Sequence, residues 1–144
     1  MGKRVASGGI MGRKQLTYVV VEDGRDKGKA FLITEMAAYA AEKWATRLLF
    51  ALINSGVELP NNIFASGMAG IAVIGIEGLT KLSYAQAEPL LDEMFSCVSV
   101  MPDPMKPNVT RPLIENDIEE VATRFILRFE ILKLHINFSM PGKS

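Results

Sequence analysis

The chain has 144 residues, which is the size of one small domain with its own hydrophobic core. Its 16 Lys and Arg residues balance 16 Asp and Glu residues, so no bulk charge attracts nucleic acid or an anionic membrane. Zero net charge combined with 49% hydrophobic residues favours a protein that associates with other chains. The single cysteine, Cys97, excludes an internal disulfide and is typical of the reducing cytosol.

The first segment, residues 1–14, predicts a flexible basic arm, because it is rich in glycine and contains no acidic residue. A solvated tail is the simpler interpretation. The alternative is a contact with nucleic acid or a partner through the basic residues Lys3, Arg4, Arg13 and Lys14.

A β-hairpin is predicted next. Residues 16–22 (LTYVVVE) and 29–34 (KAFLIT) are rich in β-branched and aromatic side chains, and residues 23–28 have turn composition. Two strands alone are marginally stable, so the hairpin must lie on helices or pair with another strand.

Helical periodicity begins at residue 35 and continues to residue 55, with Trp44 as the expected core anchor and Gly56 suited to a left-handed C-cap. Residues 63–82 predict a second helix. It carries four glycines, which destabilise a helix and therefore indicate close approach of a neighbouring backbone. These are Gly67, Gly70, Gly75 and Gly78.

A third helix is predicted from the capping box formed by Ser83 and Gln86 to about Val98. Residues 101–112 hold four of the seven prolines, so they predict an ordered loop that crosses to the last helix.

The strongest periodicity in the chain belongs to residues 116–138, which predict a long helix with Asn116 as N-cap and Glu119 as its reciprocal partner. One apolar stripe is expected to face the core. It consists of Ile118, Val121, Ala122, Phe125, Phe129, Leu132 and Ile136. A second apolar face consists of Ile126, Leu127, Ile131 and Leu134. A helix that is apolar on two faces needs a second surface to contact, either in its own chain or in another.

Together these elements predict a mainly α fold of the α+β class. A compact helical domain of about four helices, within a single domain over residues 15–138, is preceded by the small N-terminal β-hairpin. Residues 139–144 are expected to be a frayed tail.

Candidate catalytic residues are scarce. His135 is the single histidine, and its position near the end of the last helix favours a structural role, as burial does for Cys97. The acidic clusters fall in a turn and at helix ends, and the terminal Gly142-Lys143-Ser144 lacks the rest of a phosphate-binding loop. The sequence therefore predicts no enzyme, no cofactor and no metal site. The charge-free stretch over residues 59–76 is too short to span a membrane.

Several short strings between residues 31 and 138 resemble tail assembly chaperones of long-tailed, siphovirus-type bacteriophages. They are Thr34-Glu35-Met36, Ala41-Glu42-Lys43-Trp44-Ala45, Ser66-Gly67-Met68-Ala69-Gly70, Ala87-Glu88-Pro89-Leu90-Leu91-Asp92-Glu93-Met94, Met101-Pro102-Asp103-Pro104 and Ile118-Glu119-Glu120-Val121-Ala122-Thr123. The run over residues 31–138 in which they lie spans about three quarters of the chain, and none of the strings has a derivable chemistry.

The resemblance implies a protein of the host cell cytoplasm that is absent from the mature virion. It would bind the tape-measure protein, keep it soluble and promote tail tube polymerisation around it. A programmed frameshift would add an extension that contacts the tail tube protein, and codons for Pro141-Gly142-Lys143 permit such a slippery site.

Excess apolar helical surface agrees with this role and predicts self-association into a homo-oligomer. Tape-measure helices are expected to bind in a groove between the glycine-rich helix and the outer face of the last helix. The predicted partner-binding residues are Met68, Ile71, Ile74, Ile126, Leu127, Ile131 and Leu134. The alternatives are a structural virion protein, such as a head–tail connector or tail terminator, and a small nucleic-acid-binding regulator that uses the basic arm.

Overall fold

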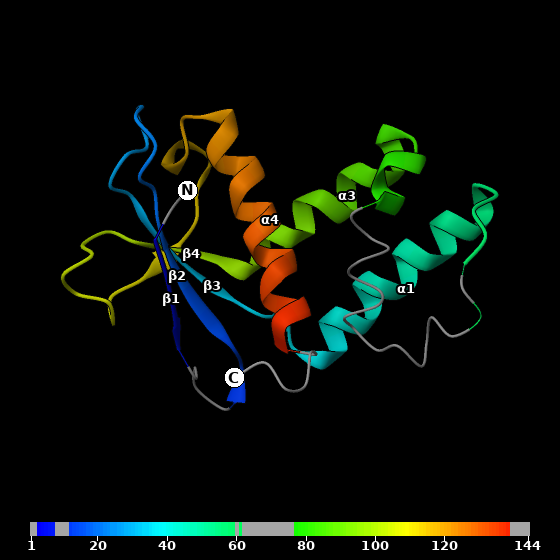
Figure 1. Cartoon of the computed structure of the whole chain (residues 1–144), viewed down its shortest axis with the longest axis horizontal. Helices are drawn as coiled ribbons and strands as arrows, with labels where there is room; N and C mark the ends of the chain where they lie inside the picture. The colour runs from blue at the N-terminus through cyan, green and yellow to red at the C-terminus, as the bar shows by residue number, and fades with distance from the viewer. Residues whose placement is uncertain (1–2, 8–11, 60, 62–76, 139–144) are drawn as a thin grey trace. The chain divides into compact units, whose positions relative to one another are not determined.

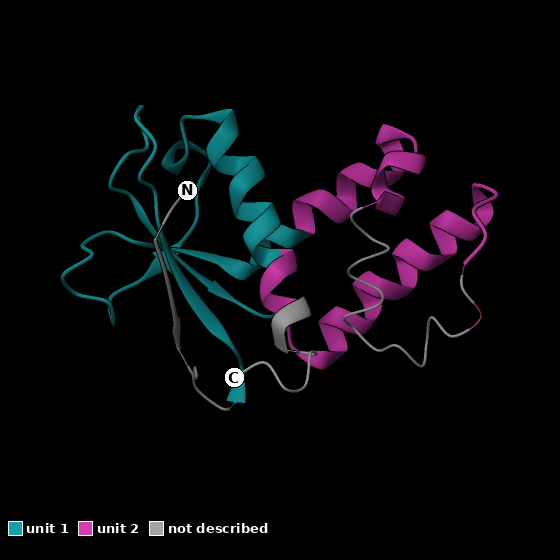
Figure 2. Ribbon diagram, viewed as in Figure 1, with its two compact units in different colours: residues 1–35, 94–131 teal, residues 36–93, 132–144 magenta. Residues whose placement is uncertain are grey.

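The computed structural model describes residues 3–7, 12–59, 61 and 77–138. The chain divides into two compact units (Figure 2). Unit 1 contains residues 1–35 and 94–131, and unit 2 contains residues 36–93 and 132–144. The single domain expected over residues 15–138 stays a prediction. Each unit is described by itself below.

Unit 1 is built on an antiparallel sheet of five strands that follow one another in chain order (Figure 1). The strands are β1 (Lys3–Ser7), β2 (Gln15–Val19), β3 (Ala30–Thr34), β4 (Val98–Met101) and β5 (Arg111–Pro112). The hairpin predicted from the sequence forms as β2 and β3. It pairs on both sides with further strands, which supplies the support that an isolated hairpin lacks.

The register of the sheet aligns buried side chains in rows across the strands. Side chains alternate between the two faces of a strand, so residues that pair across the sheet share a face. The two rows are Leu16, Ile33 and Val98, and Tyr18, Phe31 and Val100. Each of these six side chains is at most 8% exposed, so this face of the sheet holds the core of unit 1.

Strand β1 departs from the prediction of a flexible arm over residues 1–14. Lys3–Ser7 pair with β2 in the register Lys3↔Val19 to Ser7↔Gln15. Extended backbone at the edge of β2 satisfies hydrogen-bonding groups that would otherwise face solvent, whatever side chains it carries. Composition therefore gave no sign of this strand. The predicted tail over residues 139–144 lies outside the described residues.

The expected fold class, a domain of about four helices with a small hairpin, is wrong. The described residues contain three α-helices, α1 (Ala38–Asn54), α3 (Tyr84–Met94) and α4 (Val121–Phe138), together with the five-stranded sheet. The error begins at the third helix, which was predicted to continue to Val98. The helix ends at Met94, residues 95–97 form a 3-10 turn, and Val98 opens β4 against β3.

In unit 2, Trp44 is the core anchor that the sequence predicted. Its side chain is 2% exposed, and its indole Nε1–H donates to the backbone oxygen of Leu90 at 2.9 Å, which ties α1 to α3. Leu48 and Leu52 of α1 are fully buried. A Cβ atom at Gly78 would lie 2.8 Å from Leu52 Cδ1, so this glycine makes room for a side chain of α1, whereas the sequence predicted close approach of a backbone.

The helix ends in unit 2 follow the signals in the sequence. Gly56 adopts a φ of 85° after α1, and the amide of Val57 donates to the Leu52 oxygen at 3.0 Å. The capping box before α3 is confirmed by reciprocal bonds between the backbone and side chains of Ser83 and Gln86. Most of the helix predicted over residues 63–82 lies outside the described residues. Within the part of the chain that the structure describes, no helix has the length and apolar character needed to cross a membrane.

The substitution Trp44→Phe tests the tie between α1 and α3. It removes the donor to Leu90 and part of the buried ring, so we expect the free energy of unfolding to fall by about 2 kcal/mol. Unfolding in urea, followed by circular dichroism, measures the change. The control is Thr46→Ala on the exposed side of the same helix, which should change stability by less than about 0.5 kcal/mol. An equal effect of both variants would contradict the assigned role of Trp44.

Candidate functional site

A stripe of large apolar side chains is exposed on the first part of α4, within unit 1. Val121, Phe125 and Phe129 are 67%, 65% and 46% exposed. They are spaced by four residues, so they lie on successive turns of one helix face. We call these three residues the α4 stripe. Isolated apolar residues are common on protein surfaces, but a contiguous row is a feature of binding surfaces.

The α4 stripe is the face that the sequence predicted to point into the core. The reverse holds: Leu127 and Ile131, assigned to the second and outer face, are 0% and 1% exposed. Periodicity separated Val121, Phe125 and Phe129 from Leu127 and Ile131, but it contains no information about which set packs against the rest of the chain.

The other predicted partner-binding residues are placed as follows. Leu134 is 7% exposed and Ile126 is partly buried, whereas Met68, Ile71 and Ile74 lie outside the described residues. The expectation that Leu127, Ile131 and Leu134 form an outer surface is therefore wrong, because all three are buried in the chain itself. The groove predicted between the glycine-rich helix and α4 includes residues that are not described.

The orientation of α4 is fixed at its start by the buried carboxylate of Asp26, in the turn between β2 and β3. Its side chain is 1% exposed and accepts the backbone amides of Glu119 and Glu120, each at 2.9 Å. The ammonium group of Lys29 donates to the same carboxylate at 2.9 Å. Asp26 thus binds the two residues immediately before α4, although they lie more than 90 positions further along the chain.

Burial by itself would raise the pKa of Asp26. The hydrogen bonds from Lys29, from the backbone of Glu119 and Glu120 and from the hydroxyl group of Thr123 outweigh burial, and they lower the pKa from its ordinary 3.8 to about 2. The carboxylate therefore stays ionised through the neutral and mildly acidic range.

A second set of bonds joins the same turn to the same segment. The guanidinium group of Arg25 donates to the backbone oxygen of Glu119 at 2.7 Å and to both carboxylate oxygens of Glu120 at 3.1 Å. These bonds, with the Arg25 amide, lower the pKa of Glu120. Gly24 makes room for the pairing of Arg25 with Glu120, because a Cβ atom at this position would meet the Glu120 carboxylate at 3.0 Å. Its φ of 147° is also one that residues with a side chain rarely adopt.

The loop that leads into this segment is held by Asp117. Its carboxylate receives two bonds from the Arg111 guanidinium group, at 2.6 and 2.9 Å, and one from the Ile114 amide at 2.7 Å. The Arg111 bonds are the main reason that the pKa of Asp117 is lowered. The N-cap predicted at Asn116 is wrong, because residues 115–117 form a 3-10 turn and α4 begins only at Val121.

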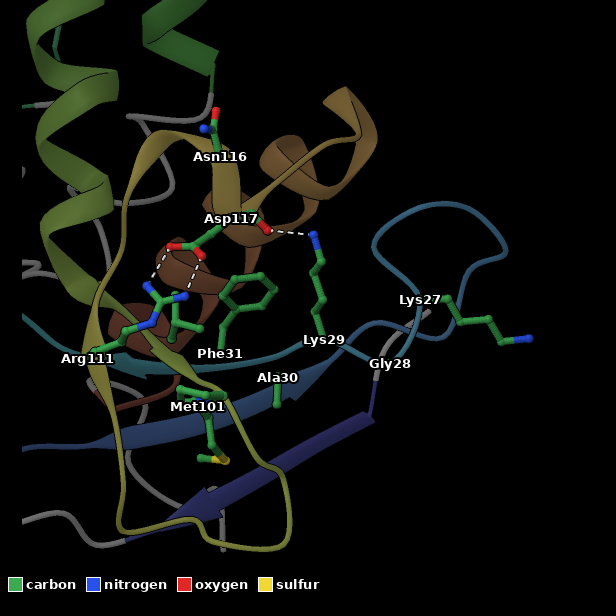
Figure 3. Close-up of a pocket in the computed structure, with 11 residues that line it drawn as sticks. Lys27, Gly28, Lys29, Ala30, Phe31, Met101, Arg111, Asn116 and Asp117 are labelled. Carbon is green, nitrogen blue, oxygen red and sulfur yellow. Dashed lines mark hydrogen bonds and ion pairs between the residues drawn. The ribbon is translucent and has the colours of Figure 1, made fainter.

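An open pocket of about 460 Å³ lies beside Asp117, with Phe31 and Met101 among its apolar lining (Figure 3). Lys29 and Arg111 approach Asp117 from two sides, and Lys27 points away. Each of these cations already has an acidic partner, since Lys29 pairs with Asp26, Arg111 with Asp117 and Lys27 with Asp23. The charged side chains around the pocket are therefore already joined in ion pairs within the chain.

One edge of the α4 stripe is basic. Arg124 and Arg128, one turn apart, both place their guanidinium carbons over the ring of Phe95, at 4.4 and 4.5 Å from its centre. Stacking on an aromatic ring favours one position of a guanidinium group. The sequence gave no indication of this pairing, because Phe95 fell within the third helix, which was predicted to continue to Val98.

The opposite edge of the stripe carries Ala122 and Ile126. A small pocket of about 150 Å³ lies beside them. Its lining includes the acidic residues Glu22, Asp23, Asp26 and Glu120. The acidic residue Glu130 of α4 is fully buried, so it does not contribute to either edge.

Unit 2 also exposes apolar residues, on α1, but they form no continuous row. Tyr39, Phe50 and Ile53 are 69%, 61% and 52% exposed. Tyr39 and Phe50 are eleven positions apart, and the positions between them on that face are polar, with Lys43 lying over the Tyr39 ring.

Two residues with reactive side chains, Cys97 and His135, lie in surroundings that favour a role in the fold. Cys97 is buried, and the Nε2 atom of His135 accepts the Met36 amide at 3.0 Å within unit 2. Among residues 3–7, 12–59, 61 and 77–138, no three His, Cys, Asp or Glu side chains group closely enough to hold a metal ion. The terminal residues 142–144 are not described.

Comparison of the chain with models of known protein families, with curated proteins and with solved structures found no match.

The substitution Asp26→Asn tests the link between the turn and α4. It removes the negative charge that Lys29 and two amides share, so we expect the free energy of unfolding to fall by about 2–3 kcal/mol. The matched control is Asp23→Asn in the same turn, whose side chain is 95% exposed and which should cost less than about 0.5 kcal/mol. Urea unfolding of both variants measures the difference, and similar losses would refute the assignment.

Asp26 also predicts a specific acid sensitivity. Its pKa is lower in the folded chain than the ordinary 3.8, so its contribution to stability is present above about pH 4 and is lost as the pH falls towards 2. The difference corresponds to about 2 kcal/mol. Wild-type protein should therefore lose about that much more stability than Asp26→Asn between pH 5 and 2, measured by urea unfolding. Parallel pH profiles for the two proteins would contradict this contribution.

Proposed function

We propose that this protein is a tail assembly chaperone of a long-tailed bacteriophage, which binds helices of the tape-measure protein and keeps them soluble during tail assembly. The observation that carries the proposal is the α4 stripe. It presents two phenylalanine rings and a valine on a helix whose start is fixed by Asp26 and Arg25. A fixed apolar row of this kind suits an amphipathic helix, which offers a complementary row at similar spacing.

The size of the stripe suits reversible binding. From Val121 to Phe129 it spans about 12 Å at roughly 1.5 Å per residue, which is about two helical turns. Such a contact buries few side chains, and its affinity is offset by the cost of association. A long helical partner can compensate by offering many similar turns to many copies of the protein. Each copy could then leave as the tail tube forms.

The resemblance of residues 31–138 to the chaperone family supports the same role and supplies the rest of the proposal. The protein would act in the host cell cytoplasm and be absent from the mature virion. It would self-associate, and a frameshifted extension would contact the tail tube protein. A non-enzymatic role is supported by the structural hydrogen bonds of Asp26 and His135, which engage two of the residues best suited to acid–base chemistry.

Co-expression with the tape-measure protein of the same phage tests the function. We expect the wild-type chain to keep tape-measure fragments in the soluble fraction and to co-purify with them. The double variant Phe125→Ser and Phe129→Ser should reduce the recovered tape-measure protein by at least about tenfold, because it removes both rings from the stripe.

The matched control is Phe50→Ser, the same change at an exposed position of α1 in unit 2, which should retain most of the recovery. Circular dichroism should show all variants folded, since the three rings are exposed. If wild-type protein recovers no tape-measure fragment while both proteins are soluble, the proposed function is wrong.

A further inference from the structure

The two edges of the sheet in unit 1 differ in their capacity to pair with another strand. One edge is β5, which has only two residues, and the nitrogen of Pro112 carries no hydrogen to donate. The other edge is β1, whose five residues pair with β2 one to one, without a proline or a bulge. Within the described residues, no further strand pairs with the outer side of β1. This edge is therefore the one that can accept a strand.

The backbone of β1 supplies the hydrogen-bonding groups for such a contact. In an antiparallel strand, alternate residues direct their amide and carbonyl groups to opposite sides. The groups of β1 that do not face β2 thus form a row with no partner strand in the described part of the chain. A row of this kind is a template for main-chain hydrogen bonds with a further strand. We propose that it pairs with β1 of a second copy of this chain, in an antiparallel dimer centred on Val5 that joins the two sheets into one.

The sequence of β1 favours this centre. A two-fold axis at Val5 aligns all five residues and pairs Val5 with its own copy, and β-branched pairs stabilise neighbouring strands. The same axis pairs Lys3 with Ser7 and Arg4 with Ala6, so each cation lies opposite an uncharged residue. An axis at Arg4 would pair two arginines, and an axis at Arg4 or Ala6 would leave only three residues of each strand paired.

The two cations of β1 therefore select a register. Basic residues at a sheet edge commonly prevent unwanted pairing, because a second strand brings like charges together. With the axis at Val5 no cation lies directly opposite another, whereas the shift to Arg4 is penalised. A five-residue strand pair is a small contact, so we expect a reversible dimer. The inference goes beyond the proposed function, because it rests on the sheet edge and applies to any role of the protein.

Engineered cysteines test the pairing and its register in the full-length chain. Val5→Cys brings the two new thiol groups opposite each other, so mild oxidation should link most of the protein into dimers on a non-reducing gel. Ser7→Cys is the matched control, because its two thiol groups would lie about 14 Å apart, at roughly 3.4 Å per residue, which is too far for a disulfide. Both variants also carry Cys97→Ala, which removes the buried native thiol. No cross-link in Val5→Cys, or an equal yield in both variants, would overturn the proposal.

Substitutions that change the charge at position 7 give an independent measurement by sedimentation equilibrium. Ser7→Glu places a carboxylate opposite Lys3 twice in each dimer, so we expect the dissociation constant to fall at least about threefold. Ser7→Lys opposes like charges at the same two positions and should raise the constant at least about threefold. A wild-type chain that stays monomeric up to about 0.5 mM, or a shift in the same direction for both variants, would contradict the pairing.

Two further outcomes would overturn the proposal by assigning the contact elsewhere. One is a dimer that Phe125→Ser dissociates and the substitutions at Ser7 do not affect, which would make the α4 stripe the contact between copies. The other is a monomeric chain that binds an extended acidic peptide and loses it in Lys3→Glu, which would give β1 a different partner. Recovery of tape-measure fragments is measured separately, so a monomer that still recovers them refutes only the strand pairing.

Discussion

The buried carboxylate of Asp26 is the constraint on which the proposed surface depends. It joins the turn between β2 and β3 to the backbone just before α4, and Lys29 balances its charge. A carboxylate at this depth is stable only with such partners, so the turn and the helix start must meet in one arrangement. Arg25 adds a second link to Glu120. Because the start of α4 is held, its rotation is also held, and Val121, Phe125 and Phe129 remain exposed.

The sequence was informative where the signal is local. β-Branched and aromatic side chains with intervening turn residues predicted the β2–β3 hairpin, the capping box marked the start of α3, and Gly56 marked the end of α1. Trp44 was identified as a core residue because a large ring at a helical core position rarely has another role. These features depend on residues within one or two turns of each other, which a sequence displays directly.

The errors have a common physical origin in long-range pairing. β1 and β4 are strands because β2 and β3 provide edges for them, and nothing in Lys3–Ser7 distinguishes a strand from an arm. The outward face of α4 was misassigned for the same reason. Its two apolar faces are similar in composition, and the choice between them is made by Asp26, more than 90 residues away. Of the candidate site, the sequence therefore predicted an apolar excess on this helix, but not the exposed side chains or the cationic edge.

The distance along the chain between Asp26 and Glu120 also orders the events of folding. During synthesis the β2–β3 hairpin leaves the ribosome long before the amides of Glu119 and Glu120 that donate to Asp26, so this carboxylate stays hydrated until nearly the whole polypeptide is made. Contacts of this separation carry a large loop-closure cost and form late. The aromatic rings of α4 thus become an oriented surface only as the last elements join the sheet. A nascent chain would therefore not yet present Val121, Phe125 and Phe129 as an oriented surface.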